Sequence, residues 1–312
     1  MVVDRSPGRS PSRDDTKPKV AYRTRLGRAY QGSAESYLRS AATRRLLGKV
    51  QLILTSPPFP LNRAKRYGNA RAEDYEEWLR KFARLFKQLL RRNGSVVIEL
   101  GNAWQPGRPV MSTLAIRSLL AFQEEGGFNL CQQFIYFNPA RLPTPAQWVN
   151  VERIRVKDAY TNLWWMSPST RPKADNRNVL REYSSAMKHL LTSRSYNSGT
   201  RPSEHRIGRF SFLRDNGGAI PPNVLVYPNT KSSTSYQEYC RRKRLGLHPA
   251  RMPVEVAEFF INFLTDPRDL VFDPFAGSNT TGYAAAKLGR RWISVELDKD
   301  YVRGSRGWFA RR

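Results

Sequence analysis

Apolar residues recur along the chain in two alternating patterns. From residue 74 to residue 92 they return every three or four positions, which predicts a helix with one buried face. Short, mainly apolar runs at 49–54 and 95–100 flank this helix and predict buried strands. The alternation predicts further helices near 111–125, 178–190, 253–264 and 280–288, strands at 130–136, 269–272 and 292–296, and a last helix from Asp298. Strands alternating with helices are typical of an α/β fold, so we expect a mostly parallel, twisted sheet covered on both faces.

Two stretches interrupt this alternation. Residues 1–28 are basic and rich in proline and serine but lack apolar periodicity, so we expect a disordered tail, with order beginning near Ala29. Between residues 150 and 250, Lys and Arg total 18 against 7 Asp and Glu, and long periodic stretches are rare. We interpret residues 151–247 as a basic region inserted into the α/β domain, which leaves that domain in two halves, 29–150 and 248–312.

The charge balance of the chain indicates a polyanionic partner. Its 312 residues include 53 Lys and Arg against 26 Asp and Glu, which gives a formal net charge of +27. Such an excess favours binding to nucleic acid through the phosphate backbone. A basic run within the inserted region is either a DNA-binding phosphate patch or a solvated stretch, and we assign it to DNA. It consists of Arg241, Arg242, Lys243 and Arg244.

The composition excludes several other classes of protein. Two Cys and three His, without the spacing of metal ligands, exclude a disulfide framework and a zinc site built on thiolates, so we expect no metal. No run of 18 apolar residues predicts a membrane span, and the polar N-terminus is unlike a signal peptide. We therefore expect a cytoplasmic protein without a membrane partner.

A glycine loop between a predicted strand and a predicted helix carries the sharpest local signal. It runs from Asp273 to Gly282, where glycines and a helix N-terminus let a ligand approach free backbone N–H groups. The loop lacks the lysine of a P-loop and the glycine spacing of a dinucleotide-binding loop. Glu296 ends the next strand, where its carboxylate can accept hydrogen bonds from ribose hydroxyls. The alternative interpretation is a tight turn with a capping acid.

A second motif, Ser56-Pro57-Pro58-Phe59, follows the strand at 49–54, and its prolines place it just beyond the end of that strand. Together with Asp273-Pro-Phe-Ala-Gly-Ser-Asn-Thr-Thr281, it resembles the β subgroup of DNA amino-methyltransferases, which use S-adenosylmethionine. In that subgroup the catalytic motif precedes the recognition insertion, and the cofactor motif comes last. Other segments, among them Phe137-Asn-Pro139 and Ile220-Pro-Pro-Asn223, resemble the PvuII-type cytosine-N4 modification methylases of restriction–modification systems.

The resemblance implies a Rossmann-like methyltransferase fold that acts on double-stranded DNA, with a cognate restriction endonuclease as a functional partner. It implies a catalytic half at 29–150, a target-recognition region at 151–247 and a cofactor-binding half at 248–312. The implied catalytic residues are Ser56, Pro57, Pro58 and Phe59. The implied residues for S-adenosylmethionine are Asp273, Phe275, Gly277, Ser278, Thr280, Glu296, Ser33 and His248. The chain departs from the family at Gly32-Ser33, where members often carry Gly-Asp with the Asp facing the adenine of the cofactor.

The Ser-Pro-Pro-Phe motif suits methylation of an exocyclic amino group. The lone pair of such a nitrogen is delocalised into the ring, so acceptors at its N–H groups make it more nucleophilic. The Ser56 hydroxyl and the Pro57 carbonyl can supply two acceptors, and Phe59 can stack on a base taken out of the helix. Cytosine-C5 methylation would need a Pro-Cys pair, which neither cysteine provides.

The identity of the methylated base rests on the resemblance. The serine form of the motif resembles cytosine-N4 enzymes, and the hexamer CAGCTG is the first recognition site that the resemblance suggests. Two alternatives are an adenine-N6 methyltransferase and a non-catalytic DNA-binding protein of the same fold.

Overall fold

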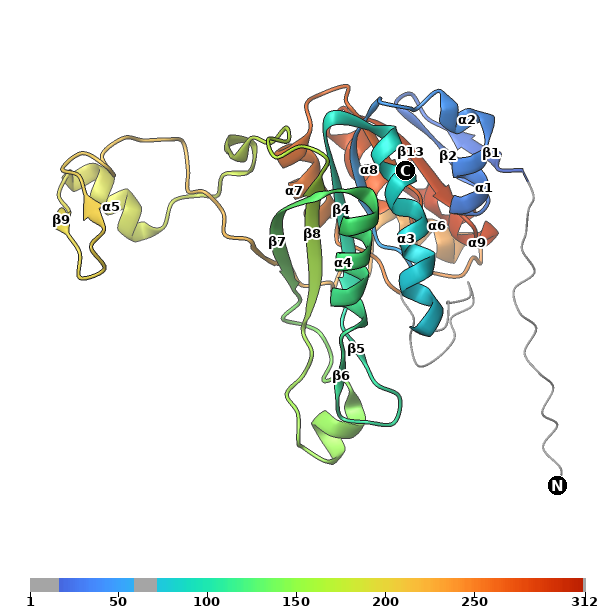
Figure 1. Ribbon diagram of the computed structural model, residues 1–312, viewed down its shortest axis with the longest axis horizontal. Coiled ribbons are helices and arrows are strands. Elements are labelled where there is room, and N and C mark those ends of the chain that lie inside the picture. Colours follow the sequence, from blue (N-terminus) through green and yellow to red (C-terminus); the bar gives the residue numbers. More distant parts are fainter. Residues whose placement is uncertain (1–16, 59–71, 311–312) are drawn as a thin grey trace.

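A nine-stranded sheet forms the centre of the protein in this computed structural model, which describes residues 17–58 and 72–310 (Figure 1). In spatial order its strands are β1 (Lys19–Arg23), β2 (Gly27–Gln31), β13 (Arg291–Glu296), β12 (Leu270–Asp273), β3 (Val50–Thr55), β4 (Leu90–Gly101), β8 (Tyr160–Ser167), β7 (Asn129–Phe137) and β11 (Val224–Val226). The five strands from β2 to β4 run parallel, as does the pair β7 and β11. The remaining neighbours are antiparallel. The prediction of a mostly parallel sheet is confirmed.

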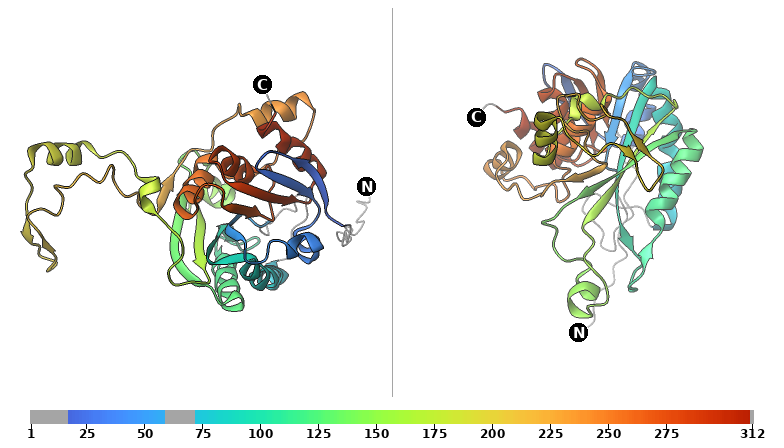
Figure 2. Two further views of the ribbon diagram at one scale, coloured as in Figure 1. Left: turned by 90° about the horizontal axis from the view of Figure 1, so that it is seen from above. Right: turned by 90° about the vertical axis from the view of Figure 1, so that its left-hand side faces the viewer.

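Helices cover both faces of this sheet, as Figure 2 shows from two further directions. One face carries α1 (Ala34–Arg39), α2 (Ala41–Arg44), α3 (Ala72–Leu89) and α4 (Leu114–Gly126), and the other carries α7 (Val254–Leu264) and α8 (Thr280–Lys287). The apolar stripe of α3 is buried on the first face, where Phe82 and Phe86 lie in the core. Four of them, α3, α4, α7 and α8, begin and end within a few residues of the helices that the apolar period predicts, whereas α1 and α2 were not predicted.

The parallel strands bring their carboxyl ends to one edge of the sheet. All six residues of β3 are buried, so this strand is fixed in the core and the chain leaves it at Ser56. The neighbouring strands end at Asp273, Glu296 and Gly101, and β2 ends just before Gly32. Ligands in open α/β sheets bind beyond these carboxyl ends, so the edge is where a site is expected.

The N-terminal boundary predicted from sequence is wrong. Residues expected in a disordered tail form β1 and the first two residues of β2, an antiparallel pair at the edge of the sheet. Tyr22 explains this order, because its ring packs against Trp292 at 6.2 Å and Phe309 at 6.0 Å between centroids. Its hydroxyl is also hydrogen-bonded to Ser305 at 2.7 Å. The aromatic partners lie more than 260 residues away in the chain, so no local pattern indicates the strand.

The region predicted as a single insertion, 151–247, is divided in the structure. Residues of β8 lie inside the central sheet between β4 and β7, because Leu163, Trp164, Trp165 and Met166 are buried. Near its other end, α6 (Ser235–Arg242) contacts α9 (Lys299–Ser305) and the short helix η3 (Arg306–Trp308). The expectation of one contiguous insertion is therefore corrected.

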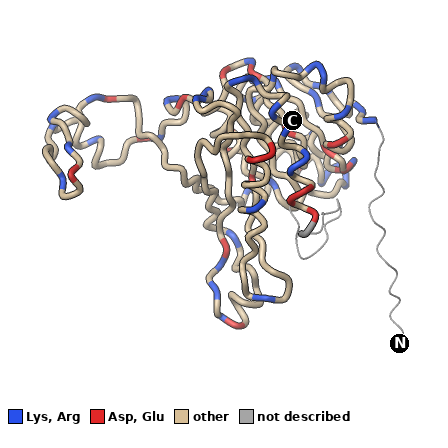
Figure 3. The backbone as a smooth tube through the Cα atoms, viewed as in Figure 1, with Lys and Arg blue, Asp and Glu red and all other residues tan. Residues whose placement is uncertain are grey.

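Two segments project from the body instead (Figure 1). The first, called the lower projection here, comprises residues 102–113 and 138–159 and carries β5 (Ala103–Trp104), β6 (Met111–Ser112) and the π-helix η1 (Gln147–Val151). The second, called the lateral projection, comprises residues 180–219 and carries α5 (Ser185–Ser193), β9 (Gly199–Thr200) and β10 (Arg206–Ile207). Lys and Arg are spread along both (Figure 3). Within 17–58 and 72–310, the structure contains no helix with the length and apolarity needed to cross a membrane.

Candidate active site

A cavity of about 590 Å³ opens at the carboxyl ends of the parallel strands. That volume lies in the range of small-molecule sites. It brings together residues that the sequence analysis assigned to catalysis or to the cofactor: Ser33, Ser56, Pro57, Pro58, His248, Asp273, Phe275, Gly277, Ser278, Thr280 and Glu296. Phe59, the last residue of the proposed catalytic motif, lies outside the described residues.

The glycine loop approaches the cavity with its backbone. Gly277 has φ +51°, and a Cβ atom there would lie 2.8 Å from Nε2 of His248. Only glycine therefore fits this position without strain or displacement. The next residues are held from outside the loop, since the Trp308 indole donates to the carbonyl of Ser278 at 2.8 Å and the Asn279 amide donates to Tyr22 at 2.9 Å. The loop is thus a rigid wall.

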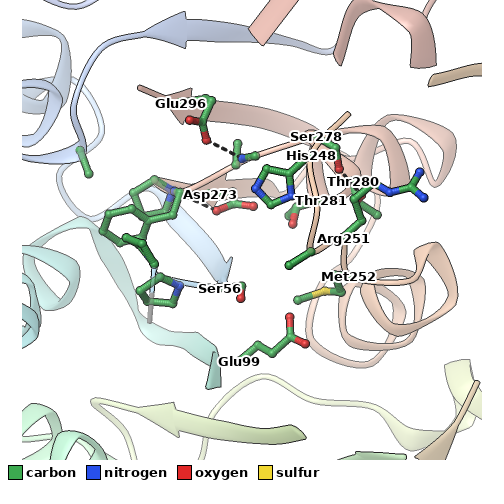
Figure 4. A pocket seen from close by; sticks show the side chains of 18 of the residues that line it. Ser56, Glu99, His248, Arg251, Met252, Asp273, Ser278, Thr280, Thr281 and Glu296 are labelled. Atoms are coloured by element: carbon green, nitrogen blue, oxygen red, sulfur yellow. Dashed lines mark hydrogen bonds between the residues drawn. The ribbon is translucent and has the colours of Figure 1, made fainter. Parts of the chain in front are cut away.

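Glu296 is fixed at the end of β13, next to the glycine loop (Figure 4). One carboxylate oxygen accepts the backbone N–H of Gly277 at 2.7 Å, and the other accepts that of Asp298 at 2.8 Å. Burial raises the pKa of Glu296 to about 7, while these two bonds lower it. Each carboxylate oxygen has further acceptor capacity, so the group can still receive hydroxyl donors from the cavity.

Asp273 lines the same cavity but also ties two strands together. Its Oδ1 accepts the Thr55 hydroxyl at 2.7 Å and the backbone N–H of Phe275 at 3.1 Å. Burial raises the pKa of Asp273 to about 6. The hydrogen bond with Thr55 joins the end of β12 to the end of β3. Since Ser56 directly follows Thr55 in the chain, Asp273 helps to position Ser56.

Glu99 is the main residue that sequence reasoning missed. It lies on β4 opposite Ser56, because the parallel register pairs Thr55 with Ile98, and both side chains line the cavity (Figure 4). Burial raises the pKa of Glu99 to about 7, while a hydrogen bond with the Ser56 side chain and the charge of Arg141 lower it. An acid inside the apolar run 95–100 was the available signal, because a carboxylate in a buried strand needs a specific partner.

An acid–indole pair forms another part of the wall. The Trp78 indole donates to Oε1 of Glu35 at 2.8 Å, and both residues line the cavity. The Trp78 ring lies 5.5 Å from the ring of Phe275 and 5.0 Å from that of Phe82. The apolar stripe of α3 was interpreted as core, and Trp78 shows that one member of it also reaches the site.

The four basic residues of the predicted phosphate patch are not among the residues that line the cavity. They are exposed at the end of α6 and just beyond it. Arg241 donates to the carbonyl of Ser232, and the Arg242 guanidinium lies 5.6 Å from the centre of the Tyr239 ring. Their contact with DNA stays a prediction.

Comparison with known proteins agrees with this geometry. A sequence model of the DNA methylase family matches residues 50–306, and the chain belongs to that family. It is similar to the type II methyltransferase M.PvuII of Proteus hauseri, with 43% identity over 289 residues that cover 92% of this chain and 84% of that protein.

Two solved structures are also similar to this chain. A PvuII DNA methyltransferase described as cytosine-N4-specific matches with a TM-score of 0.75 and 36% identity, over 94% of this chain and 90% of the other. A complex of M1.HpyAVI with SAM matches with a TM-score of 0.54 and 21% identity, over 92% of this chain and 100% of the other. At that identity the second likeness concerns the fold alone.

Proposed function

We propose that this chain transfers a methyl group from S-adenosylmethionine to N4 of a cytosine that has been rotated out of duplex DNA. One observation carries the proposal: a single cavity joins the glycine loop and Glu296 to Ser56 and Glu99. The similarity to proteins described as type II and cytosine-N4-specific methyltransferases supports the choice of reaction and of base.

The residues present fit the methyl donor. Gly277 leaves space that any side chain would fill, and Phe275 and Trp78 offer apolar surface for a base. Glu296 presents a fixed carboxylate for ribose hydroxyls. When bound, S-adenosylmethionine supplies an electrophilic methyl group on a sulfonium, which needs no further activation. The protein then has to position the target amino nitrogen, and positioning alone contributes several kcal/mol in favourable cases.

Ser56 and Glu99 can activate the amino group and remove its proton. The Ser56 hydroxyl, hydrogen-bonded with the Glu99 side chain, keeps lone pairs that can accept an N–H of the base. As the nitrogen forms its bond to the methyl carbon, the carbon–sulfur bond breaks and the nitrogen becomes acidic. Its proton can pass to Ser56 Oγ while the Ser56 proton passes to Glu99. Glu99 must be ionised at the start of this step.

The two projections are proposed to hold the duplex. The lateral projection carries seven Lys and Arg against three Asp and Glu between residues 180 and 219. The lower projection begins beside the active site, where Asn102 and Arg141 line the cavity. We assign phosphate contacts to both projections and to residues 241–244, because basic side chains supply most of the affinity of such proteins for DNA. We propose that the target-recognition role predicted for 151–247 belongs chiefly to the lateral projection.

The proposed cellular role is protection of DNA in the cytoplasm against a cognate restriction endonuclease. That enzyme would be a functional partner that recognises the same sequence, not a subunit. CAGCTG is the first site to test, since it is the hexamer suggested by the resemblance.

The decisive experiment identifies the methylated base. DNA containing CAGCTG is incubated with the protein and labelled donor, digested to nucleosides and separated by mass spectrometry. N4-methylcytosine is expected. N6-methyladenine would replace the proposal by the adenine alternative, and no modified base on CAGCTG or on genomic DNA would favour the non-catalytic one.

Replacing Ser56 tests its assigned role. Ser56→Ala should reduce methyl transfer on the order of 10²-fold or more, the usual scale for a positioned polar group. Calorimetric titration with S-adenosylhomocysteine should give nearly unchanged affinity, because the glycine loop and Glu296 are untouched. Turnover close to that of the unmodified protein would remove Ser56 from the mechanism.

A further inference from the structure

Glu35 occupies a position in the cavity that the proposed chemistry has not yet used. It lies in the first turn of α1, and its carboxylate is partly exposed to the cavity. Trp78 fixes this carboxylate by donating to Oε1 at 2.8 Å. The Trp78 ring in turn packs against both Phe82 and Phe275, which also contact each other. An acid held in place by a packed indole is preorganised to accept a hydrogen bond.

Ser33, two residues earlier, is committed to the helix instead. Its hydroxyl accepts the backbone N–H of Ser36 at 3.0 Å and so caps α1. Its carbonyl accepts the backbone N–H of Tyr37 at 3.0 Å. The Ser33 side chain is a neutral hydroxyl, so it brings no charge to the cavity. Its oxygen already accepts a hydrogen bond within the helix.

The position of Glu35 identifies the part of a ligand that it would meet. The backbone N–H of Gly32 donates to the carbonyl of Glu296 at 3.0 Å, so the start of α1 lies beside the end of β13. Glu35 and Trp78 line the cavity from α1 and α3, whereas Ser56 lines it from the residue after β3 and Glu99 from β4. A nucleoside with its ribose at Glu296 and its reacting end at Ser56 would place its base at this acid–indole pair.

We propose that Glu35 accepts a hydrogen bond from the 6-amino group of the adenine of S-adenosylmethionine and selects for that group. This inference rests on the proposed function, because it assumes that the cavity holds this donor. A carboxylate can accept but not donate, so it favours a base edge with an amino donor. Phe275 and Trp78 supply the apolar surface against which a purine packs.

The test compares two ligands that differ only in the 6-amino group. S-adenosylhomocysteine and its 6-deamino analogue, in which purine replaces adenine, are titrated calorimetrically into the full-length protein. The unmodified protein should bind the adenine compound at least about tenfold more tightly, which is the scale of one hydrogen bond to a charged group. In Glu35→Ala the two affinities should become equal.

Two further variants keep the test independent of folding. Glu35→Gln retains the size of the side chain and a neutral acceptor, so it should keep a reduced preference for the adenine compound. Glu77→Ala removes an acid from α3 that is 65% exposed and pairs with Arg80, and it should keep the full preference.

The outcomes separate this inference from the proposed function. If the unmodified protein binds neither compound, the proposed function itself fails. Equal binding of both compounds by the unmodified protein overturns the inference alone. A loss of affinity for both compounds in Glu35→Ala, with the ratio unchanged, also overturns it, since the acid would then support the wall without reading the base.

Discussion

Replacing Glu99 by Gln should stabilise the protein in alkaline solution while impairing catalysis. Burial raises the pKa of Glu99 from 4.5 to about 7. Since one pKa unit corresponds to about 1.4 kcal/mol, the ionised group costs the folded state up to about 3 kcal/mol. Glu99 faces an open cavity, so water reduces this cost and the figure is an upper bound. Gln has the same shape and cannot ionise.

The sign of the effect follows from the raised pKa. Below about pH 4.5 the carboxyl is protonated in both the folded and the unfolded chain, so it carries no such cost. Between pH 4.5 and 7 the unfolded chain loses this proton while the folded chain keeps it, so stability falls across this range and levels off once the folded group is ionised above pH 7. The advantage of Glu99→Gln should therefore be absent near pH 4.5, small at pH 5 and fully developed at pH 8.5.

Thermal unfolding at pH 5 and pH 8.5, without cofactor, measures this difference. At roughly 2–4 °C per kcal/mol, Glu99→Gln should raise Tm by several degrees at pH 8.5 and by much less at pH 5. Asp273 and Glu296 also have raised pKa values, which contribute to the pH dependence of both proteins. The charge of Asp273 is one of the causes that raise the pKa of Glu99, so the contribution of Asp273 cancels only in part in the comparison. An equal change in Tm at both pH values, or a lower Tm for the variant at pH 8.5, would refute the reasoning.

The same substitution should remove a step in the pH profile of catalysis. Methyl transfer by the unmodified protein should increase about tenfold per pH unit below 7 and then level off, because Glu99 has to be ionised to take the proton. Single-turnover rates for Glu99→Gln should be lower on the order of 10²-fold and should lack this step. If Glu99→Gln still showed the increase in rate with pH below 7, that increase would have to come from ionisation of another group.

Two other substitutions test the cofactor loop and the basic run. Gly277→Ala should weaken S-adenosylhomocysteine binding at least about tenfold in calorimetry, because the new Cβ would lie 2.8 Å from Nε2 of His248 at φ +51°. Gly289→Ala is the matched control, since its φ is +76° but no atom lies within 4 Å of the new Cβ; an equal loss in both would mean that backbone strain alone is responsible. Replacing residues 241–244 by Gln should reduce the slope of log DNA affinity against log salt by about 0.9 for each phosphate that is no longer neutralised, and an unchanged slope would separate these residues from the DNA.

The sequence predicts the parts of the fold whose signals are local. The apolar period of α3 and the buried run of β3 identify both elements. By contrast, the pairing of Ser56 with Glu99 depends on the register between β3 and β4, and register is set by packing across the sheet. The edge strand β1 was also missed because its order depends on distant residues: Tyr22 contacts its aromatic partners only in the folded chain.

Some residues of the candidate site could be predicted from the local sequence pattern, and others could not. Asp273 and Glu296 were placed correctly at strand ends because each closes an apolar run, and the strand–loop–helix order puts them together. Glu35 gave no such sign, since an acid in the first turn of a helix is ordinary. Its meaning depends on the Trp78 indole, which comes from a helix 43 positions further along the chain.

The anchors of the glycine loop have a consequence for synthesis of the protein. Asn279 is tied to Tyr22 across 257 positions, and Ser278 is tied to Trp308 near the other end of the chain. The wall of the cavity is therefore complete only after its first and last strands and helices have met. A chain still emerging from the ribosome, or one released before its final helix, would present both sequence motifs without an assembled site. Methyl transfer would then require chains in which Tyr22 and Trp308 have both reached the glycine loop.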